Sequence, residues 1–180
     1  MSKRIIQISK LMSLVLRHQP SVIGVELDKN GWLSVEELLE GIRRKGINVD
    51  FDLLVEVVET NTKKRFAFNE ERTRIRANQG HSIEVDVELN VAEPPETLYH
   101  GTVFRFIDAI KENGLLPMSR QNVHLSHDIS TAQNVGGRRG TPIVLKVKAK
   151  EMHKNGFVFY LSENGVWLTD KVEPKFIQFN

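Results

Sequence analysis

The chain has 180 residues, of which 40% are apolar and 27% charged, with a formal net charge of +2. This composition supports a buried core and argues against wholesale disorder. The absence of cysteine excludes disulfides, thiolate metal sites and a cysteine nucleophile. The basic first segment has no long apolar run, so we expect neither a signal peptide nor a membrane span, and a soluble cytoplasmic protein.

Three helices are predicted in the first part of the chain. Apolar residues recur at helical spacing over residues 5–15. Ser34 begins a capping box, Ser-Val-Glu-Glu, for a second helix that Gly46 ends. Asp50 or Asp52 is placed to cap a third.

A basic hairpin is predicted next, with strands at residues 65–68 and 74–77 flanking a polar stretch. Residues 63–76 hold six basic and two acidic side chains. Such a cluster is either a solvated surface or a face for a polyanion. Three helices followed by a basic hairpin are typical of a winged helix. We therefore expect a winged-helix RNA-binding lobe over residues 1–80, although many such modules bind proteins instead.

The pattern changes after residue 80. Residues 83–89 alternate between apolar and acidic side chains, which predicts a half-exposed strand, and Pro94 with Pro95 marks a linker. We therefore place a connecting strand and linker over residues 81–97. Residues 98–180 then form a β-rich domain, so the fold class is α+β. The predicted strands are 98–100, 123–125, 143–147, 157–161, 166–168 and 176–179, and the predicted helices are 104–113 and 130–135.

Four side chains are candidates for holding a phosphate group. Arg17 and His18 end the first helix, where the helix dipole alone favours a cation by ~0.3–1 kcal/mol. Pro20 already stops that helix, however, and two adjacent cations point in different directions, so the pair resembles a fork. Arg65 begins a hairpin strand, and Arg120 lies in a polar loop. Arginine suits phosphate because its planar fork offers paired donors.

Two histidine strings are further candidates. His100-Gly101-Thr102 is predicted to lie between a strand and a helix, where Gly101 permits close approach and Thr102 caps. The helix N-terminus would then favour an anion. His124 and His127 have ligand-like spacing for a helix, but their surroundings predict a strand and a loop, so we predict no metal site.

Seven strings, in order along nearly the whole chain, resemble the RNA 2′-phosphotransferase family, also called tRNA 2′-phosphotransferase. Each is weakly specific alone, and together they are highly specific. They are Leu16-Arg17-His18, Asp28-Lys29-Asn30-Gly31-Trp32, Lys63-Lys64-Arg65-Phe66, Ile75-Arg76-Ala77-Asn78-Gln79-Gly80-His81-Ser82, Leu98-Tyr99-His100-Gly101-Thr102, Met118-Ser119-Arg120-Gln121-Asn122-Val123-His124-Leu125-Ser126 and Asn164-Gly165-Val166-Trp167-Leu168-Thr169.

The resemblance implies a winged-helix lobe joined to an NAD-binding lobe of the ADP-ribosyltransferase fold over residues 98–180, with the active site in the cleft. It implies NAD+ as a consumed co-substrate and RNA with an internal 2′-phosphate, such as spliced tRNA, as the partner. The 2′-phosphate would attack C1″ of the nicotinamide riboside and expel nicotinamide. The ribose O2″ would then attack phosphorus and release RNA with a free 2′-hydroxyl and ADP-ribose 1″,2″-cyclic phosphate.

The resemblance also implies roles for residues. The catalytic set is Arg17, His18, Arg65 and Arg120. Fixed guanidinium groups stabilise the negative charge that develops around phosphorus, and His18 is the one member that exchanges a proton near neutral pH. The implied NAD+-binding residues are His100, Gly101, Thr102, Ser119, His124, Ser126, Arg138 and Val166.

Two alternatives stay open. An enzyme that stops after the first step would be a nucleic-acid-phosphate ADP-ribosyltransferase, and the presence of all four catalytic residues argues against it. A non-catalytic winged-helix RNA-binding protein would have no reason to keep an NAD+ pocket, so His100 and His124 argue against that reading.

Overall fold

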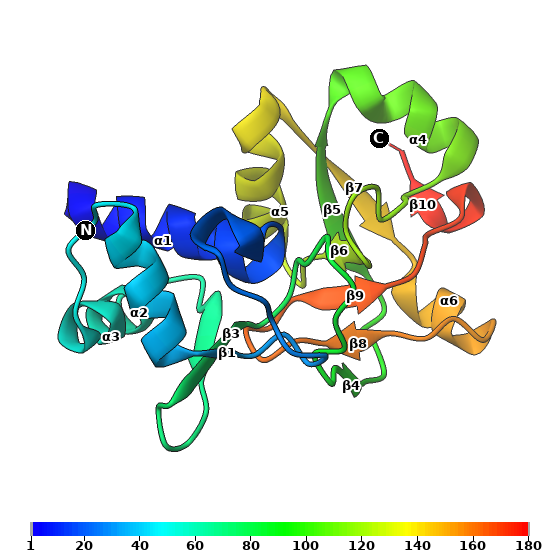
Figure 1. Cartoon of the computed structure of the whole chain (residues 1–180). Helices are drawn as coiled ribbons and strands as arrows, with labels where there is room; N and C mark the ends of the chain where they lie inside the picture. The colour runs from blue at the N-terminus through cyan, green and yellow to red at the C-terminus, as the bar shows by residue number, and fades with distance from the viewer. Residues whose placement is uncertain (1, 180) are drawn as a thin grey trace. The chain divides into compact units, whose positions relative to one another are not determined.

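The computed structural model describes residues 2–179 and contains helices and short strands in both halves of the chain (Figure 1). This mixture confirms the predicted α+β class. The chain divides into two compact units, one up to Glu88 and the other from Leu89.

The first unit contains the three predicted helices, because each begins at a side chain able to cap it. They are α1 (Lys3–Arg17), α2 (Val35–Arg44) and α3 (Phe51–Glu59), with the 3-10 helix η1 (Pro20–Ile23) after the first. The Ser34 hydroxyl accepts a hydrogen bond from the Glu37 N–H at 3.4 Å, and the Asp50 carboxylate accepts one from the Leu53 N–H at 2.9 Å. The caps predicted from Ser34 and Asp50 are confirmed.

A small antiparallel sheet completes the first unit. It has the order β1-β3-β2, formed by β1 (Leu33–Ser34), β3 (Arg74–Ala77) and β2 (Phe66–Phe68). The β2–β3 pair is the predicted hairpin. The two-residue strand β1 has too little alternation to be seen in the sequence. The buried face of the sheet packs on the helices through side chains that include Ile8, Leu16, Leu38, Leu54, Phe66 and Ile75.

The strand predicted over residues 83–89 is wrong, since the structure assigns none there. The alternation itself is real: Val85 and Val87 are buried, and Asp86 between them is exposed. The Asp86 N–H donates to the Lys29 carbonyl at 2.8 Å, but no ladder forms along the segment. The alternating burial of residues 83–89 therefore comes from a segment that lies against the loop containing Lys29 without forming a strand ladder. The next strand is β4 (Asn90–Val91).

The second unit holds two antiparallel sheets, of order β10-β7-β5 and β4-β8-β9-β6. Within this unit α5 lies along β5 (Figure 1). Predicted strands near 123–125 and 143–147 and the helix near 130–135 are confirmed, whereas the helix α6 was missed. The elements are β5 (Leu98–Val103), η2 (Phe104–Phe106), α4 (Ile107–Asn113), β6 (Val123–Leu125), α5 (Ile129–Gly136), η3 (Gly137–Arg139), β7 (Pro142–Val147), α6 (Ala149–Lys154), β8 (Tyr160–Leu161), β9 (Trp167–Thr169), η4 (Pro174–Phe176) and β10 (Ile177–Gln178).

Candidate functional site

The C-terminal end of α1 presents Arg17 and His18 in different environments. Arg17 is the last helical residue and is buried, whereas His18 is the C-cap and is exposed. The Ser82 N–H donates to the Arg17 carbonyl at 2.9 Å, and the Ser82 hydroxyl lies 2.9 Å from His18 Nδ1. Gly80 lies against the Arg17 guanidinium, because a Cβ at Gly80 would be 3.6 Å from Arg17 Cζ. Ser82 thus contacts both residues of the pair.

His81 lies between these contacts and is 2% exposed. Burial and, to a lesser extent, the charges of Arg17, His18 and Arg76 lower its pKa to about 4, although a hydrogen bond to the Leu16 backbone offsets part of this lowering. Its Nε2 has no hydrogen-bond partner among residues 2–179. His81 is therefore neutral near pH 7 and adds no positive charge beside the Arg17–His18 pair.

Two buried asparagines hold the loop that leads into Arg65. The Asn61 side-chain oxygen accepts hydrogen bonds from the N–H groups of Lys63 and Arg65 at 3.2 and 3.4 Å. The Asn78 amide donates to the Lys64 carbonyl at 2.6 Å, and its backbone N–H donates to the Arg65 carbonyl at 2.9 Å. As a result Lys63 and Lys64 are exposed while Arg65 is half-buried.

The segment Asn78–Ser82 therefore contacts three of the four predicted catalytic residues. Its first residue holds the backbone of Arg65, Gly80 lies against Arg17, and Ser82 contacts both Arg17 and His18. The sequence assigned no role to Asn61 or to Ser82, although Ser82 ends one of the seven family strings, because nothing in their local sequence distinguishes them from other polar loop residues.

The basic hairpin is largely compensated by carboxylates. Arg76, besides its ion pair, lies over the Trp32 ring, and its guanidinium carbon is 4.4 Å from the ring centroid. Burial raises the Asp28 pKa, but hydrogen bonds from Trp32 and Arg74 outweigh it and leave that pKa lowered. The ion pairs are Arg72 with Glu59, Arg74 with Asp28 and Arg76 with Glu88.

In the second unit the His-Gly-Thr string lies inside β5, so its predicted place at a helix N-terminus is wrong. Thr102 is buried and caps nothing, because η2 begins after Val103 without a side-chain cap. A Cβ at Gly101 would collide with the Ala132 carbonyl of α5. Gly101 is therefore required for close packing between strand and helix.

The two predicted NAD+-pocket histidines are neighbours on adjoining strands. His100 Nδ1 lies 3.2 Å from the His124 carbonyl, and Tyr99 forms an isolated antiparallel β-bridge with Ser126. A carbonyl only accepts hydrogen bonds, so Nδ1 of His100 carries the proton and Nε2 is left as an acceptor in the neutral ring. Burial lowers the His100 pKa, and the charge of Arg139 lowers it further.

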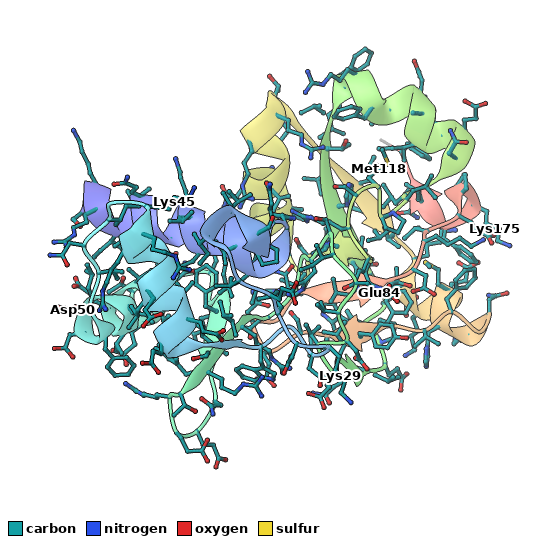
Figure 2. All side chains as sticks on the ribbon, in the orientation of Figure 1. Lys29, Lys45, Asp50, Glu84, Met118 and Lys175 are labelled. Atoms are coloured by element: carbon teal, nitrogen blue, oxygen red, sulfur yellow. The ribbon has the colours of Figure 1, made fainter. Side chains whose placement is uncertain are left out.

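Arg120 lies in the turn before β6, where its N–H donates to the Pro117 carbonyl at 3.1 Å. In the same turn Ser119 is exposed, and Met118 is 86% exposed with a φ of 58° (Figure 2). Desolvation lowers the Arg120 pKa, and so do the charges of Arg139 and Arg138. Three guanidinium groups therefore share one region of the second unit.

The last predicted pocket residue, Val166, is half-buried just before β9. Its N–H donates to the Ser162 hydroxyl at 3.0 Å. The following strand pairs Leu168 with His124, so Val166 lies near the end of the strand beside the histidine strand.

The family model for "RNA 2′-phosphotransferase, Tpt1 / KptA family" matches residues 3–171. The chain belongs to this family. It is 58% identical to a probable RNA 2′-phosphotransferase of Flavobacterium johnsoniae, over 96% of this chain and 94% of that relative. A probable RNA 2′-phosphotransferase of Fusobacterium nucleatum is 51% identical, over 97% of this chain and 98% of that relative.

Membership of the RNA 2′-phosphotransferase family confirms the resemblance inferred from the seven strings and makes the chain a transferase. Across residues 2–179 no group of three or more His, Cys, Asp or Glu side chains is arranged to hold a metal ion. Within the same residues, every helix is too short or too polar to cross a bilayer.

Proposed function

We propose that the protein removes an internal 2′-phosphate from RNA by transferring it to ADP-ribose of NAD+. The proposed products are RNA with a free 2′-hydroxyl, nicotinamide and ADP-ribose 1″,2″-cyclic phosphate, formed through a 2′-phospho-ADP-ribosylated RNA. The observation that carries the proposal is the shared contact of Arg17, His18 and the Arg65 backbone with Asn78–Ser82. A transferase of phosphate needs such a fixed set of cations.

The proposed phosphate site suits a dianion on a flexible RNA. Arg17 is buried against Gly80, so its guanidinium is held in place and little is lost in ordering it when phosphate binds. Hydrogen bonds likewise fix the backbone of Arg65, the residue directly before β2. His18, with its Nδ1 beside the Ser82 hydroxyl, is the proposed proton-exchanging member of the set.

The residues of the second unit fit NAD+ by their chemistry. Arg138 and Arg139 supply positive charge for a pyrophosphate, while neighbouring His100 and His124 offer ring nitrogens to ribose hydroxyls. NAD+ supplies a sugar carbon from which a neutral base departs readily. The protein then needs to orient the phosphate more than it needs a strong general base.

We also propose the finer fold assignment. Helices α1, α2 and α3 followed by the β2–β3 hairpin support a winged-helix lobe over residues 1–80, with residues 81–97 as connection. The two short antiparallel sheets of the second unit support an NAD-binding lobe of the ADP-ribosyltransferase type over residues 98–180. A spliced tRNA in the cytoplasm is the proposed RNA.

One assay tests the proposal against its alternatives. An RNA oligonucleotide with a labelled internal 2′-phosphate is incubated with the protein, with and without NAD+. We expect label to appear in ADP-ribose cyclic phosphate only when NAD+ is present. Label retained on ADP-ribosylated RNA would instead show an ADP-ribosyltransferase, and no reaction at all would favour an RNA-binding protein.

A further inference from the structure

A group of arginine and phenylalanine side chains lies at one end of β5, and it includes neither the four proposed catalytic residues nor the two histidines. Two short 3-10 helices carry it, η2 directly after β5 and η3 directly after α5, and η3 contacts β5. We call it the arginine–phenylalanine face, and its members are Phe104, Arg105, Phe106, Arg138 and Arg139.

Phe106 links the two helices of this face. The guanidinium carbon of Arg105 lies 4.9 Å from the Phe106 ring centroid, and that of Arg139 lies 5.8 Å from it. One arginine from each helix is therefore held at the same half-buried ring. Side chains fixed in this way lose little freedom when they bind an anion.

The arginines of this face have no acidic partner. Within residues 2–179, no ion pair to a carboxylate is formed by Arg105, Arg138 or Arg139. An uncompensated set of guanidinium groups attracts an anion with several phosphates more strongly than a set paired with carboxylates does.

Phe104 is 81% exposed at the start of η2, next to Arg105. A single exposed apolar side chain is ordinary on a protein surface. A flat aromatic ring beside an unpaired guanidinium is, however, the arrangement on which bases of single-stranded nucleic acid stack. One ring offers too little apolar area for a protein partner or a membrane.

We propose that the arginine–phenylalanine face binds the single-stranded RNA that flanks the 2′-phosphorylated nucleotide. Arg105 and Arg139 bind backbone phosphates, and a base stacks on Phe104. The inference rests on the proposed function, because it takes Arg120 as a member of the site that receives the phosphate. The turn that carries Arg120 leads into β6, and both β6 and η3 contact β5.

Two residues of the face, Phe104 and Arg105, allow RNA binding to be tested separately from NAD+ binding. Phe104 lies four residues beyond His100, which is roughly 13 Å along an extended chain. Phe104 and Arg105 are therefore the residues to test, since Arg138 and Arg139 are also proposed to serve the co-substrate.

The test measures RNA binding without NAD+, by fluorescence anisotropy, for a trimer and a dodecamer that each carry one internal 2′-phosphate. For the dodecamer, we expect Phe104→Ala to raise Kd about fivefold or more. Arg105→Gln should lower the slope of log K against log salt by about 0.7. The trimer offers only one nucleotide on each side of the phosphorylated one, so its binding should fall less than that of the dodecamer in both variants.

Two matched variants serve as controls. Ile129→Ala removes another exposed apolar side chain of the same unit, and Lys175→Gln removes a cation of that unit that is paired with Glu173. Both should bind the dodecamer like the wild type. Dodecamer binding unchanged in Phe104→Ala and Arg105→Gln would overturn the proposal, and so would an equal loss for both RNA lengths. Thermal melts of each variant exclude misfolding as the cause of a loss.

Failure of the wider functional proposal would be seen separately. It would appear as wild-type protein that fails to turn over the trimer with NAD+, whereas the binding comparison needs no turnover. An unchanged dodecamer Kd in an active enzyme would leave the catalytic proposal standing and remove only the RNA-binding face.

Discussion

On the hairpin of the first unit three arginines each meet a carboxylate, whereas on the arginine–phenylalanine face of the second unit none does within residues 2–179. Net charge alone would suggest that the first half has more cations available for an anion. Residues 1–80 carry +3 (14 basic minus 11 acidic), whereas residues 81–180 carry −1 (11 minus 12). In the more basic half, carboxylates therefore pair with the arginines of the hairpin, whereas the more acidic half contains arginines without a carboxylate partner among residues 2–179. Charge counted along a sequence says little about which cations can receive an anion.

The largest expected effect is on kcat, and it should distinguish the proposed catalytic Arg120 from Arg72, which is paired with a carboxylate. Arg120→Ala should lower kcat by about 100-fold or more, because its guanidinium would no longer stabilise charge at phosphorus. NAD+ binding, measured by calorimetry, should change little. Arg72→Ala, which breaks the exposed pair with Glu59, should stay within about twofold of the wild-type rate. Equal rates for Arg120→Ala and wild type would remove Arg120 from the site.

The next effect concerns the helix that leads to η3 and its two arginines. Gly101→Ala should destabilise the second unit by about 2–4 kcal/mol, because the new Cβ would meet the backbone of α5. Gly137→Ala is the matched control, since nothing lies within 4 Å of a Cβ there. Urea unfolding followed by Trp167 fluorescence in a Trp32→Phe background measures both. A tolerated Gly101→Ala would show that α5 shifts freely along β5.

Acid should weaken the first unit through His81. Its folded pKa of about 4 lies below the ordinary 6.5, so the unfolded chain binds more protons between these values. The stabilising contribution is complete above pH 6.5 and is lost as pH falls toward 4, by up to about 3 kcal/mol. His81→Gln should flatten this part of the profile, measured by urea unfolding with Trp32 fluorescence in a Trp167→Phe background. The exposed His127→Gln should leave it unchanged.

The smallest effect tests how His18 is oriented. Ser82→Ala removes the hydroxyl 2.9 Å from His18 Nδ1 and should lower kcat about fivefold to tenfold, which corresponds to one ordinary hydrogen bond. The pH profile of kcat should shift with it, because the ring loses a partner. Ser82→Thr keeps the hydroxyl and should restore most of the rate. A loss in both variants with an unchanged pH profile would point to altered packing instead.

The structural features that could be predicted from the sequence are those formed by residues close together along the chain. The caps at Ser34 and Asp50 and the hairpin depend on neighbours within a few residues, and all were predicted correctly. The alternation at 83–89 predicted burial correctly and hydrogen bonding wrongly, because alternation reports which face is covered but not whether another strand pairs there.

Features that depend on distant partners could not be predicted. Arg74 and Asp28 are 46 residues apart, and the contact that forces a glycine at 101 comes from α5. Residue chemistry marked the arginines and histidines as candidates, but their catalytic and NAD+-binding roles were assigned through the family strings. For the Arg17–His18 pair, physical reasoning alone supported either a helix cap or a phosphate-binding fork, since a helix C-terminus commonly carries a cation.

The buried Asn78 has a consequence for the chemical ageing of the protein. Its amide nitrogen donates to the Lys64 carbonyl, and deamidation would replace that nitrogen with an oxygen that only accepts. Two acceptors would then face each other at 2.6 Å beside the loop that carries Arg65. A change of one atom, with almost no change in shape, would push that loop away from Asn78. The lifetime of the proposed phosphate site thus depends on how well burial keeps water from this amide.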